Sequence, residues 1–295
     1  MSDIRQNSIK AWVLAARPKT LSGAVMPVLI GGALALRQTG ADFNVTPFVL
    51  CVLFALIMQI DANFINDYYD FKKGADRADR LGPERACAQG WISMPCMLKG
   101  ILLTTMLACA VGAPLIYYGG WWMVAVGAIC VACCALYTLA LSYYGLGDVL
   151  VLLFFGIVPV VFTYWCIVGV ENLQLLCDAL ILGVGMGLAT DCLLMVNNYR
   201  DVNQDIISGK RTFVVMFGAR AGELAYLWLG ILAVAAVAAV AKLWALLMLP
   251  YLLLNMFTYR DLLRLSGREL NNVLGQTARN ILVFGILASV VVYMY

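Results

Sequence analysis

Two short stretches of the chain combine carboxylate and amide side chains with basic ones, and each follows a long apolar run. Their acidic and amide residues are Asn66, Asp67, Asp70 and Asp76 in the first stretch, and Asn197, Asp201 and Asp205 in the second. Charges at the end of a hydrophobic segment are costly unless they are paired or used. Asn63, Asn66, Asp67 and Asp70 are spaced by threes and fours, as are the residues of the second stretch, so each of these sets is expected on one face of its helix. We predict that the two faces meet across one site.

The chemistry that these residues favour is binding of Mg²⁺ and a diphosphate. Carboxylate and amide oxygens suit Mg²⁺, which takes one or two carboxylates per ion and completes its shell with water and phosphate. The chain contains no His, which excludes His-based acid–base catalysis and His-containing zinc sites. This number of carboxylates therefore suits two ions bridging one diphosphate. The basic residues able to supply further positive charge are Lys72, Lys73, Arg77, Lys210 and Arg211.

The elements that must position these residues are membrane helices. Of the 295 residues, 63% are apolar and 13% are charged, whereas soluble proteins have about 45–50% apolar and about 25% charged residues. We predict an all-α integral membrane protein, with nine transmembrane helices in one bundle around a central cavity. The nine expected helices cover residues 20–36, 47–70, 96–117, 121–141, 149–168, 179–199, 222–241, 243–258 and 279–295. The junction between the seventh and eighth is expected to be a tight turn at Lys242.

The distribution of basic residues predicts the orientation. With a cytoplasmic N-terminus, all of the 20 Lys and Arg residues except Arg37 and Lys242 fall on the cytoplasmic side, as the positive-inside rule requires. Both acidic stretches then face the cytoplasm. The longer charged connections at 72–95, 200–221 and 259–278 are expected to cap the cavity on that face.

The chain, residues 1–295, is predicted to be a single transmembrane domain. The second and sixth expected helices both end in Asn-x-x-x-Asp, four helices apart. This offset preserves direction, and it suggests two pseudo-repeated four-helix halves, about 17–141 and 148–258, followed by a final helix at about 279–295.

A diphosphate site at the mouth of an apolar cavity suits a substrate with a charged head and a hydrocarbon tail, such as a polyprenyl diphosphate. Loss of the diphosphate leaves an allylic cation, which a dry aromatic pocket protects from water. The aromatic residues available as walls are Tyr68, Tyr69, Tyr137, Tyr143, Tyr144, Phe154, Phe155, Tyr164 and Trp165.

These features resemble the UbiA superfamily of intramembrane prenyltransferases, and most closely its branch that prenylates 1,4-dihydroxy-2-naphthoate. The matching motifs are Ala16-Arg17-Pro18-Lys19-Thr20-Leu21, Asn66 to Asp76, Gly82-Pro83-Glu84-Arg85-Ala86, Gly145-Leu146-Gly147-Asp148, Asn197-Asn198-Tyr199-Arg200-Asp201, and Gly209-Lys210-Arg211-Thr212. The last Asp of the first motif lies at position 76, as in the naphthoate branch, rather than at position 74. The chain departs from the family between Tyr137 and Ser142, where a Gly-Gly-Pro segment and a basic residue are missing.

The resemblance implies a Mg²⁺-dependent transferase in which the diphosphate is bound through Mg²⁺ and flanked by Lys210 and Arg211. The metal-binding residues it implies are Asn66, Asp70, Asp76, Asn197, Asp201 and Asp205. We further assign catalysis to Asp70, Asp201, Asp67 and Asp191, and substrate binding to Arg17, Lys19, Lys72, Lys73, Arg77, Tyr137, Asn198, Arg200, Lys210 and Arg211.

Two carboxylates, Asp61 and Asp191, lie inside apolar runs, where an acid is costly enough to suggest a function. One hypothesis is that either acts on the acceptor hydroxyl. The alternative is a neutral, hydrogen-bonded acid that faces the bundle. The ten Cys, including the Cys130-x-x-Cys133 pair, are interpreted as buried small residues.

The leading prediction is transfer of a polyprenyl chain to 1,4-dihydroxy-2-naphthoate with decarboxylation, giving demethylmenaquinol in a bacterial inner membrane. The alternatives are another aromatic acceptor such as 4-hydroxybenzoate, or a cation or metabolite transporter, whose site is expected near the bilayer midplane. The expected partners are the prenyl diphosphate, the naphthoate and the lipid bilayer, with no nucleic acid. Prenyl length and oligomeric state are not readable from the sequence.

Overall fold

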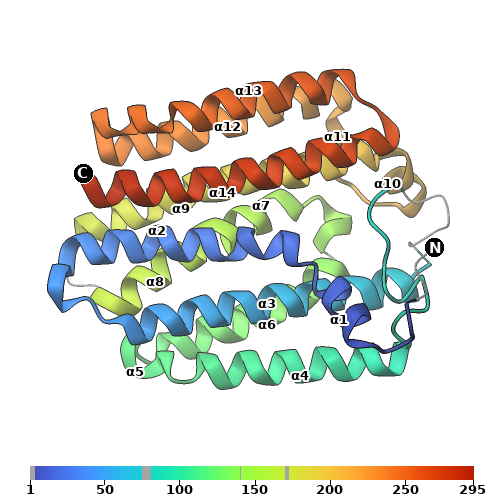
Figure 1. The fold of residues 1–295 in the computed structure, drawn as a ribbon, viewed down its shortest axis with the longest axis horizontal. Helices are drawn as coiled ribbons and strands as arrows, with labels where there is room; N and C mark the ends of the chain where they lie inside the picture. The colour runs from blue at the N-terminus through green and yellow to red at the C-terminus, as the bar shows by residue number, and fades with distance from the viewer. Residues whose placement is uncertain (1–3, 75–80, 140, 170–172) are drawn as a thin grey trace.

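The computed structural model describes residues 4–74, 81–139, 141–169 and 173–295. Within these ranges the regular structure is helical throughout, without strands. The α-helices are α1 Ile9–Ala16, α2 Leu21–Thr39, α3 Val45–Lys72, α4 Met94–Gly112, α5 Leu115–Gly119, α6 Trp122–Leu139, α7 Gly147–Leu152, α8 Val158–Val168, α9 Leu173–Arg200, α10 Val202–Ser208, α11 Phe213–Phe217, α12 Ala219–Ala241, α13 Leu249–Arg264 and α14 Leu270–Met294. The long helices run side by side in one bundle (Figure 1).

Most helices of the bundle have the length and apolar composition of membrane-spanning helices. Seven stretches of the described residues are helical, long and apolar enough to cross a bilayer. One of them, Ala219–Arg264, holds both α12 and α13, and α6 is a shorter apolar helix. The chain is therefore a multi-pass membrane protein. The count of nine crossings, the cytoplasmic N-terminus and the two pseudo-repeated halves stay predictions.

Three of the expected helices have other limits in the structure. The segment predicted as 96–117 breaks after Gly112, because Pro114 lacks a backbone N–H and ends α4 before the short α5. The segment predicted as 243–258 begins with a 3₁₀ stretch, Lys242–Met248, after the tight turn at Lys242, whose φ is +51°. The last helix begins at Leu270 rather than 279, because polar side chains of its first turns bind groups outside the helix, as Asn271 does with the carbonyl of Leu81.

The close packing of α9 depends on glycine. A Cβ on Gly156 would lie 2.3 Å from the carbonyl oxygen of Gly183 and 2.6 Å from the Cα of Gly187. Gly156 belongs to a π-helical turn, Leu153–Ile157, that joins α7 to α8. The sequence Gly183-x-Gly185-x-Gly187 thus lets two helices meet backbone to backbone, as small residues do in membrane proteins.

Asp61 joins two helices inside the membrane. Its carboxylate accepts hydrogen bonds from the hydroxyls of Thr104 and Thr105 on α4, and the residue is 1% exposed. Of the two interpretations of this acid, the structure supports a hydrogen-bonded group that faces the bundle, because both of its oxygens are occupied by α4.

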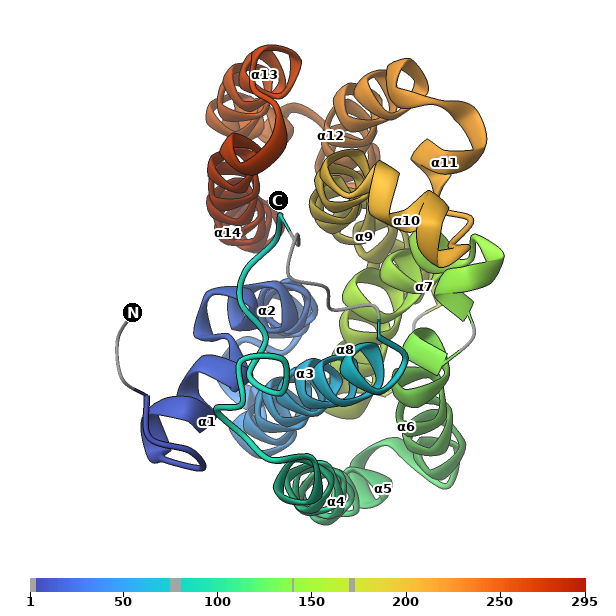
Figure 2. The same ribbon diagram turned by 90° about the vertical axis from the view of Figure 1, so that its right-hand side faces the viewer.

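The helices α3 and α9, each of 28 residues, carry both polar stretches to the same end of the bundle. At this end lie α10, α11 and residues 81–93, which precede α4 (Figure 1). Seen from this end, α3 and α9 lie on different sides of the bundle, with α2 and α8 between them (Figure 2). The fold therefore brings two clusters that are about 130 residues apart in the sequence to one end.

Candidate active site

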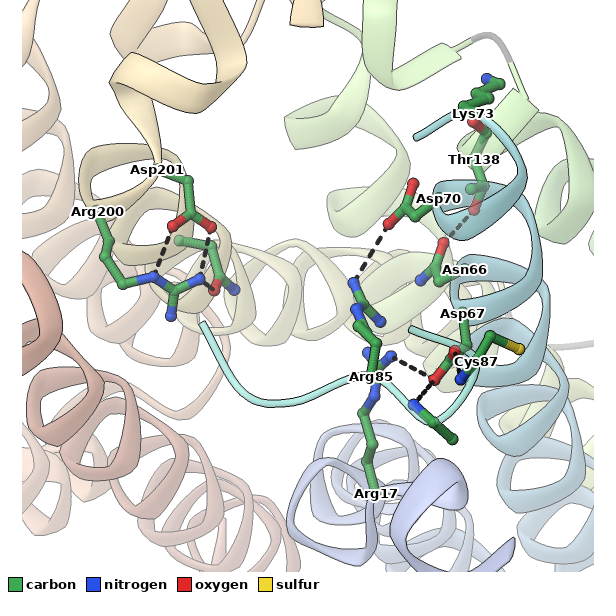
Figure 3. Close-up of polar contacts among 12 residues, drawn as sticks. Arg17, Asn66, Asp67, Asp70, Lys73, Arg85, Cys87, Thr138, Arg200 and Asp201 are labelled. Carbon is green, nitrogen blue, oxygen red and sulfur yellow. Dashed lines mark hydrogen bonds and ion pairs between the residues drawn. The ribbon is translucent and has the colours of Figure 1, made fainter. Parts of the chain in front are cut away.

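The two polar stretches line one chamber of about 1070 Å³. Its acidic and amide side chains are Asn66, Asp70, Asp148, Asn197, Asn198, Asp201, Gln204, Asp205 and Asn271, and its basic ones are Arg17, Lys73, Arg85, Arg200, Lys210 and Arg279. Asp70 and Asp201 lie on opposite sides of this space (Figure 3). The predicted meeting of the two motifs across one site is therefore what the structure shows.

The first wall of the chamber is the last part of α3. Asn66 and Asp70 point into it from successive turns, since residues four apart lie on one ridge of a helix. The hydroxyl of Thr138 on α6 donates to the Asn66 side-chain oxygen. The Arg85 guanidinium donates to Asp70 over 3.3 Å, and both residues are buried. This wall thus presents one carboxylate with one cation already beside it.

The expected single face on α3 is in fact two ridges. Asn63 and Asp67 turn away from the chamber: Asn63 donates to the carbonyl of Ala16, and Asp67 accepts the backbone N–H groups of Ala86 and Cys87 at 2.9 and 2.8 Å. At 3.6 residues per turn, a step of three displaces a side chain by about 60°, enough to separate the ridges. Asp67, with 1% exposure, holds the segment before α4 against α3.

The second wall is the end of α9. The Arg200 guanidinium donates from Nε to Asp201 Oδ1 over 2.7 Å and makes a second bond to Oδ2 of the same carboxylate. It also donates to the side-chain oxygens of Asn197, at 3.1 Å, and Asn271 of α14, at 2.9 Å. Asn271 in turn donates to the carbonyl of Leu81. Arg200, 5% exposed, therefore fixes Asp201 and ties α9 and α14 to the segment before α4.

Asp205 lies on α10, because α9 ends at Arg200 and Asp201 begins a new helix. Gly209, with φ +73°, reverses the chain after α10 and lets the backbone N–H of Lys210 bond to the carbonyl of Asp205. Burial raises the pKa of Asp205 to about 6; the cation of Lys210 opposes this rise and the carboxylate of Asp201 adds to it. The predicted set Asn197, Asp201 and Asp205 meets in the chamber, though not along one helix.

Two lysines, one from each motif, meet at a tyrosine. The Lys73 Nζ lies 4.3 Å and the Lys210 Nζ 5.8 Å from the ring centroid of Tyr143, within range of a cation–π contact. Lys73 also donates to the carbonyl of Thr138. All three side chains line the chamber, so the basic residues after each motif converge on the same side of it.

The other predicted site residues lie in the chamber, lie outside it, or fall outside the described part of the chain. Arg17, Tyr137 and Asn198 line the chamber, whereas Lys72, Arg211 and Asp191 do not. Lys72 is exposed and lies over the ring of Tyr68, Arg211 is exposed, and Asp191 is buried within α9. Lys19 lies in the 3₁₀ turn Pro18–Thr20, and its side chain is outside the described part. Asp76 and Arg77 also lie outside the described residues.

Several polar chamber residues were not among the predicted ones, among them Arg85, Asp148 and Asn271. Arg85 was visible as a basic residue in the Gly-Pro-Glu-Arg-Ala motif, and Asp148 as the acid of Gly-Leu-Gly-Asp. Asp148 has one side-chain oxygen buried without a hydrogen-bond partner. No sequence feature pointed to Asn271, because it lies in the first turn of α14, and this helix was expected to begin nine residues later, at 279.

The donor set fits Mg²⁺. The two walls of the chamber offer carboxylate and amide oxygens, and none of the described residues that line it is a cysteine. Among the described residues, no three Asp, Glu, Cys or His side chains lie close enough together to hold one metal ion. Mg²⁺ typically keeps several waters and uses one or two carboxylates together with substrate phosphate, and each wall offers one or two carboxylates.

A second, apolar cavity of about 850 Å³ continues from the chamber into the bundle. The two cavities share lining residues, among them Asn66, Tyr137 and Asn197. The apolar cavity lies between α2, α3, α6, the π-turn, α8 and α9, and its walls include Phe54, Phe154, Phe155 and Phe162. A charged head and a long apolar tail thus find adjoining spaces.

Comparison with known proteins agrees with this geometry. The chain is 33% identical over 225 residues to the 1,4-dihydroxy-2-naphthoate octaprenyltransferase of Haemophilus influenzae, covering 73% of this chain and 72% of that protein. It is 31% identical over 290 residues to the protein of the same name from Mycobacterium tuberculosis, covering 95% of each chain.

Solved structures share the fold at lower identity. The apo structure of a UbiA homolog from Aeropyrum pernix K1 superimposes with a TM-score of 0.70 at 17% identity, covering 93% of this chain and 98% of that one. A UbiA homolog from Archaeoglobus fulgidus bound to GPP and Mg²⁺ superimposes with a TM-score of 0.60 at 15% identity, covering 95% and 99%.

A helical membrane bundle with a polar chamber above an apolar cavity, together with these relatives, defines a membrane-embedded prenyltransferase. Residues 24–293 match the model of the UbiA prenyltransferase family. The chain belongs to that family.

Proposed function

We propose that this enzyme transfers a polyprenyl chain from its diphosphate to 1,4-dihydroxy-2-naphthoate, with decarboxylation, to give demethylmenaquinol. The observation that carries the proposal is the junction of the two cavities at Asn66, Tyr137 and Asn197, because a prenyl diphosphate with its head in the chamber and its tail in the apolar cavity would have its reacting carbon there. The names of the curated relatives supply the naphthoate acceptor.

The chamber residues that would hold Mg²⁺ are Asn66 and Asp70 on one wall and Asn197, Asp201 and Asp205 on the other. Two ions are proposed, one at each wall, since each wall offers at most two carboxylates. Asp76 is proposed as a further ligand. When bound, Mg²⁺ neutralises charge on the departing diphosphate. The prenyl-diphosphate and Mg²⁺ complex of the Archaeoglobus fulgidus homolog supports this cofactor.

The chain's own cations hold the diphosphate. Arg85, Arg17, Lys73 and Lys210 line the chamber, and Arg can bind phosphate oxygens in pairs. Asp70 pairs with Arg85, so the carboxylate of Asp70 would hold Mg²⁺ beside the guanidinium of Arg85, which would bind phosphate oxygens.

The apolar cavity protects the reaction from water. As the bond between the allylic carbon and the diphosphate oxygen breaks, positive charge develops on the carbon at the junction, next to the Tyr137 ring. That carbon bonds to the acceptor ring, the ring carboxyl group leaves as carbon dioxide, and its proton passes to the diphosphate. The aromatic rings of Phe154 and Phe155 in the same cavity favour the cation and exclude water. Asp191 of α9 does not line the chamber, and its proposed role is to act on the acceptor hydroxyl.

The site is proposed to face the cytoplasm of a bacterial inner membrane. All Lys and Arg residues except Arg37 and Lys242 lie toward the chamber end in the predicted topology, as the positive-inside rule requires.

The decisive experiment is product analysis. The purified protein in lipid nanodiscs receives Mg²⁺, octaprenyl diphosphate, and either 1,4-dihydroxy-2-naphthoate or 4-hydroxybenzoate. Demethylmenaquinol, formed with one equivalent of carbon dioxide, is expected from the naphthoate only. A product only from 4-hydroxybenzoate would move the enzyme to that acceptor. Ion or solute flux in proteoliposomes, without any prenylated product, would favour the transporter.

A further inference from the structure

The last helix, α14, forms one wall of the chamber. Its lining residues follow one face of the helix, since they recur at helical spacing. They are Asn271, Leu274, Gly275, Ala278, Arg279 and Leu282. Figure 2 shows α14 beside α2 and α13, and α14 also packs against α9. Asn271 joins this wall to the second acidic motif through Arg200, whereas the proposed diphosphate site makes no use of Arg279.

Arg279 lies at the depth where the chamber meets the apolar cavity. Its neighbour Ala278 lines both cavities, as do the junction residues Asn66 and Tyr137. Along α14, Arg279 comes eight residues after Asn271, a rise of about 12 Å. The charge of Arg279 is therefore at the level where the reacting carbon of a prenyl chain is proposed to lie.

A buried polar network holds Arg279 in place. The Arg279 Nη2 donates to the side-chain oxygen of Asn280 over 3.2 Å. Asn280 Nδ2 donates to the hydroxyl of Thr258 on α13 over 2.9 Å, and that hydroxyl donates to the carbonyl of Leu254. Asn280 and Thr258 are 1% and 0% exposed. The amide oxygen that receives the guanidinium therefore has a fixed orientation.

The charge of Arg279 is not matched by a carboxylate within the described part of the chain. The other arginines of the chamber each lie beside one: Arg17 beside Asp67, Arg85 beside Asp70, and Arg200 beside Asp201. Asn280, which accepts from Arg279, is neutral. Because Arg279 is also exposed, its guanidinium is open to an anionic group of a ligand at the junction.

We propose that Arg279 binds the carboxylate of the aromatic acceptor and selects acceptors that carry one. This rests on the proposed function, in which the acceptor ring meets the prenyl carbon at the junction of the two cavities. A guanidinium binds a carboxylate through two parallel hydrogen bonds. One arginine at this depth therefore both attracts the acceptor and fixes which edge of its ring faces the prenyl carbon.

The test compares Arg279→Gln with Arg264→Gln and the wild type in lipid nanodiscs. Arg264 is exposed at the same end of the bundle and does not line the chamber, so it controls for the loss of one surface charge and should match the wild type. Arg279→Gln should raise KM for 1,4-dihydroxy-2-naphthoate by at least about tenfold. It should leave kcat and KM for the prenyl diphosphate within about twofold, and Arg279→Lys should recover part of the loss.

A second compound separates the carboxylate from the ring. The compound 1,4-naphthalenediol has the same ring and hydroxyls without the carboxylate, and its inhibition constant should change by less than about twofold in Arg279→Gln. An equal rise of this constant and of KM for the naphthoate would overturn the proposal. An unchanged KM for the naphthoate would also overturn it, and would leave lipid phosphate as the partner of Arg279.

A protection measurement on the wild type covers the case in which Arg279→Gln does not fold. Bound 1,4-dihydroxy-2-naphthoate should slow modification of Arg279 by phenylglyoxal, as followed by peptide mass spectrometry, and 1,4-naphthalenediol should not. Arg264 should react equally in all samples. Equal rates at Arg279 with both compounds would overturn the proposal. If the wild type transfers no prenyl chain to the naphthoate, the transferase proposal falls, and protection of Arg279 still decides whether this arginine binds the carboxylate.

Discussion

The Arg85 guanidinium lies 3.3 Å from the carboxylate of Asp70, and both side chains are nearly buried in the wall of the chamber. This pair links the segment before α4 to the last turns of α3. Two residues that the sequence separates by a long charged connection thus share one site, and each has a distinct role in the predictions that follow.

Replacing Arg85 by Gln should weaken donor binding. Hydrogen bonds to charged groups contribute about 1.5–3 kcal/mol, so kcat/KM for the prenyl diphosphate should fall by about tenfold to a hundredfold, mainly through KM. Arg85→Lys should recover part of the loss, since lysine keeps the positive charge but lacks the planar guanidinium that donates two parallel hydrogen bonds. The exposed neighbour Glu84 provides the control, because Glu84→Gln should behave as wild type. Unchanged donor kinetics in Arg85→Gln would show that the diphosphate binds elsewhere.

Replacing Asp70 or Asp201 by Ala should abolish turnover and leave the fold intact. These carboxylates stand on the two walls where Mg²⁺ is proposed to bind, and losing one should lower kcat by at least about a hundredfold. Thermal unfolding in detergent, with and without Mg²⁺, checks both points: the metal should stabilise the wild type more than either variant. Asp42→Asn, at an exposed position on the opposite face, is the control. Near-normal activity in both Ala variants would contradict the site.

Asp67 should behave differently from Asp70. Its two oxygens accept the backbone N–H groups of Ala86 and Cys87, and an amide has only one oxygen to offer. Asp67→Asn should therefore lower the free energy of unfolding by about 1–3 kcal/mol, whereas Asp70→Asn should lower it less. Mg²⁺ titrations of the folded fraction separate the two roles, since apparent Mg²⁺ affinity should fall in Asp70→Asn and stay near wild type in Asp67→Asn. The reverse pattern would make Asp67 a metal ligand.

The acid side of the pH profile should depend on Asp205. Burial raises the pKa of this carboxyl to about 6, so protons compete with Mg²⁺ for it below that pH. Since its pKa is higher in the folded state, ionisation of Asp205 also costs stability as the pH rises toward 6 without metal. The Mg²⁺ concentration for half-maximal activity should rise as the pH falls from 7 to 5, and saturating Mg²⁺ should restore the rate. In Asp205→Asn this dependence should flatten; a wild-type slope in that variant would assign the titration to another group.

The residues by themselves determined the class of this protein and the composition of its site. Apolar runs of membrane-spanning length required a helical bundle, because backbone polar groups in lipid must be satisfied within the helix. The spacing of Asn66 and Asp70, and of Asn197 and Asp201, indicated a pair of acidic motifs, since residues four apart share a ridge. These features depend on residues that are close together in the chain, and the geometry of a single helix follows from their spacing.

Tertiary structure decided which of these groups share the chamber. Helical periodicity predicted Asp67 on the same face as Asp70. In the structure the segment before α4 packs against α3, and its backbone N–H groups at Ala86 and Cys87 donate to the Asp67 carboxylate. Arg85 and Asn271 enter the site only through that segment and through α14, and no spacing along the chain relates them to Asp70 or Asp201. Contacts between distant segments depend on how whole helices pack, which a motif read along one helix does not contain.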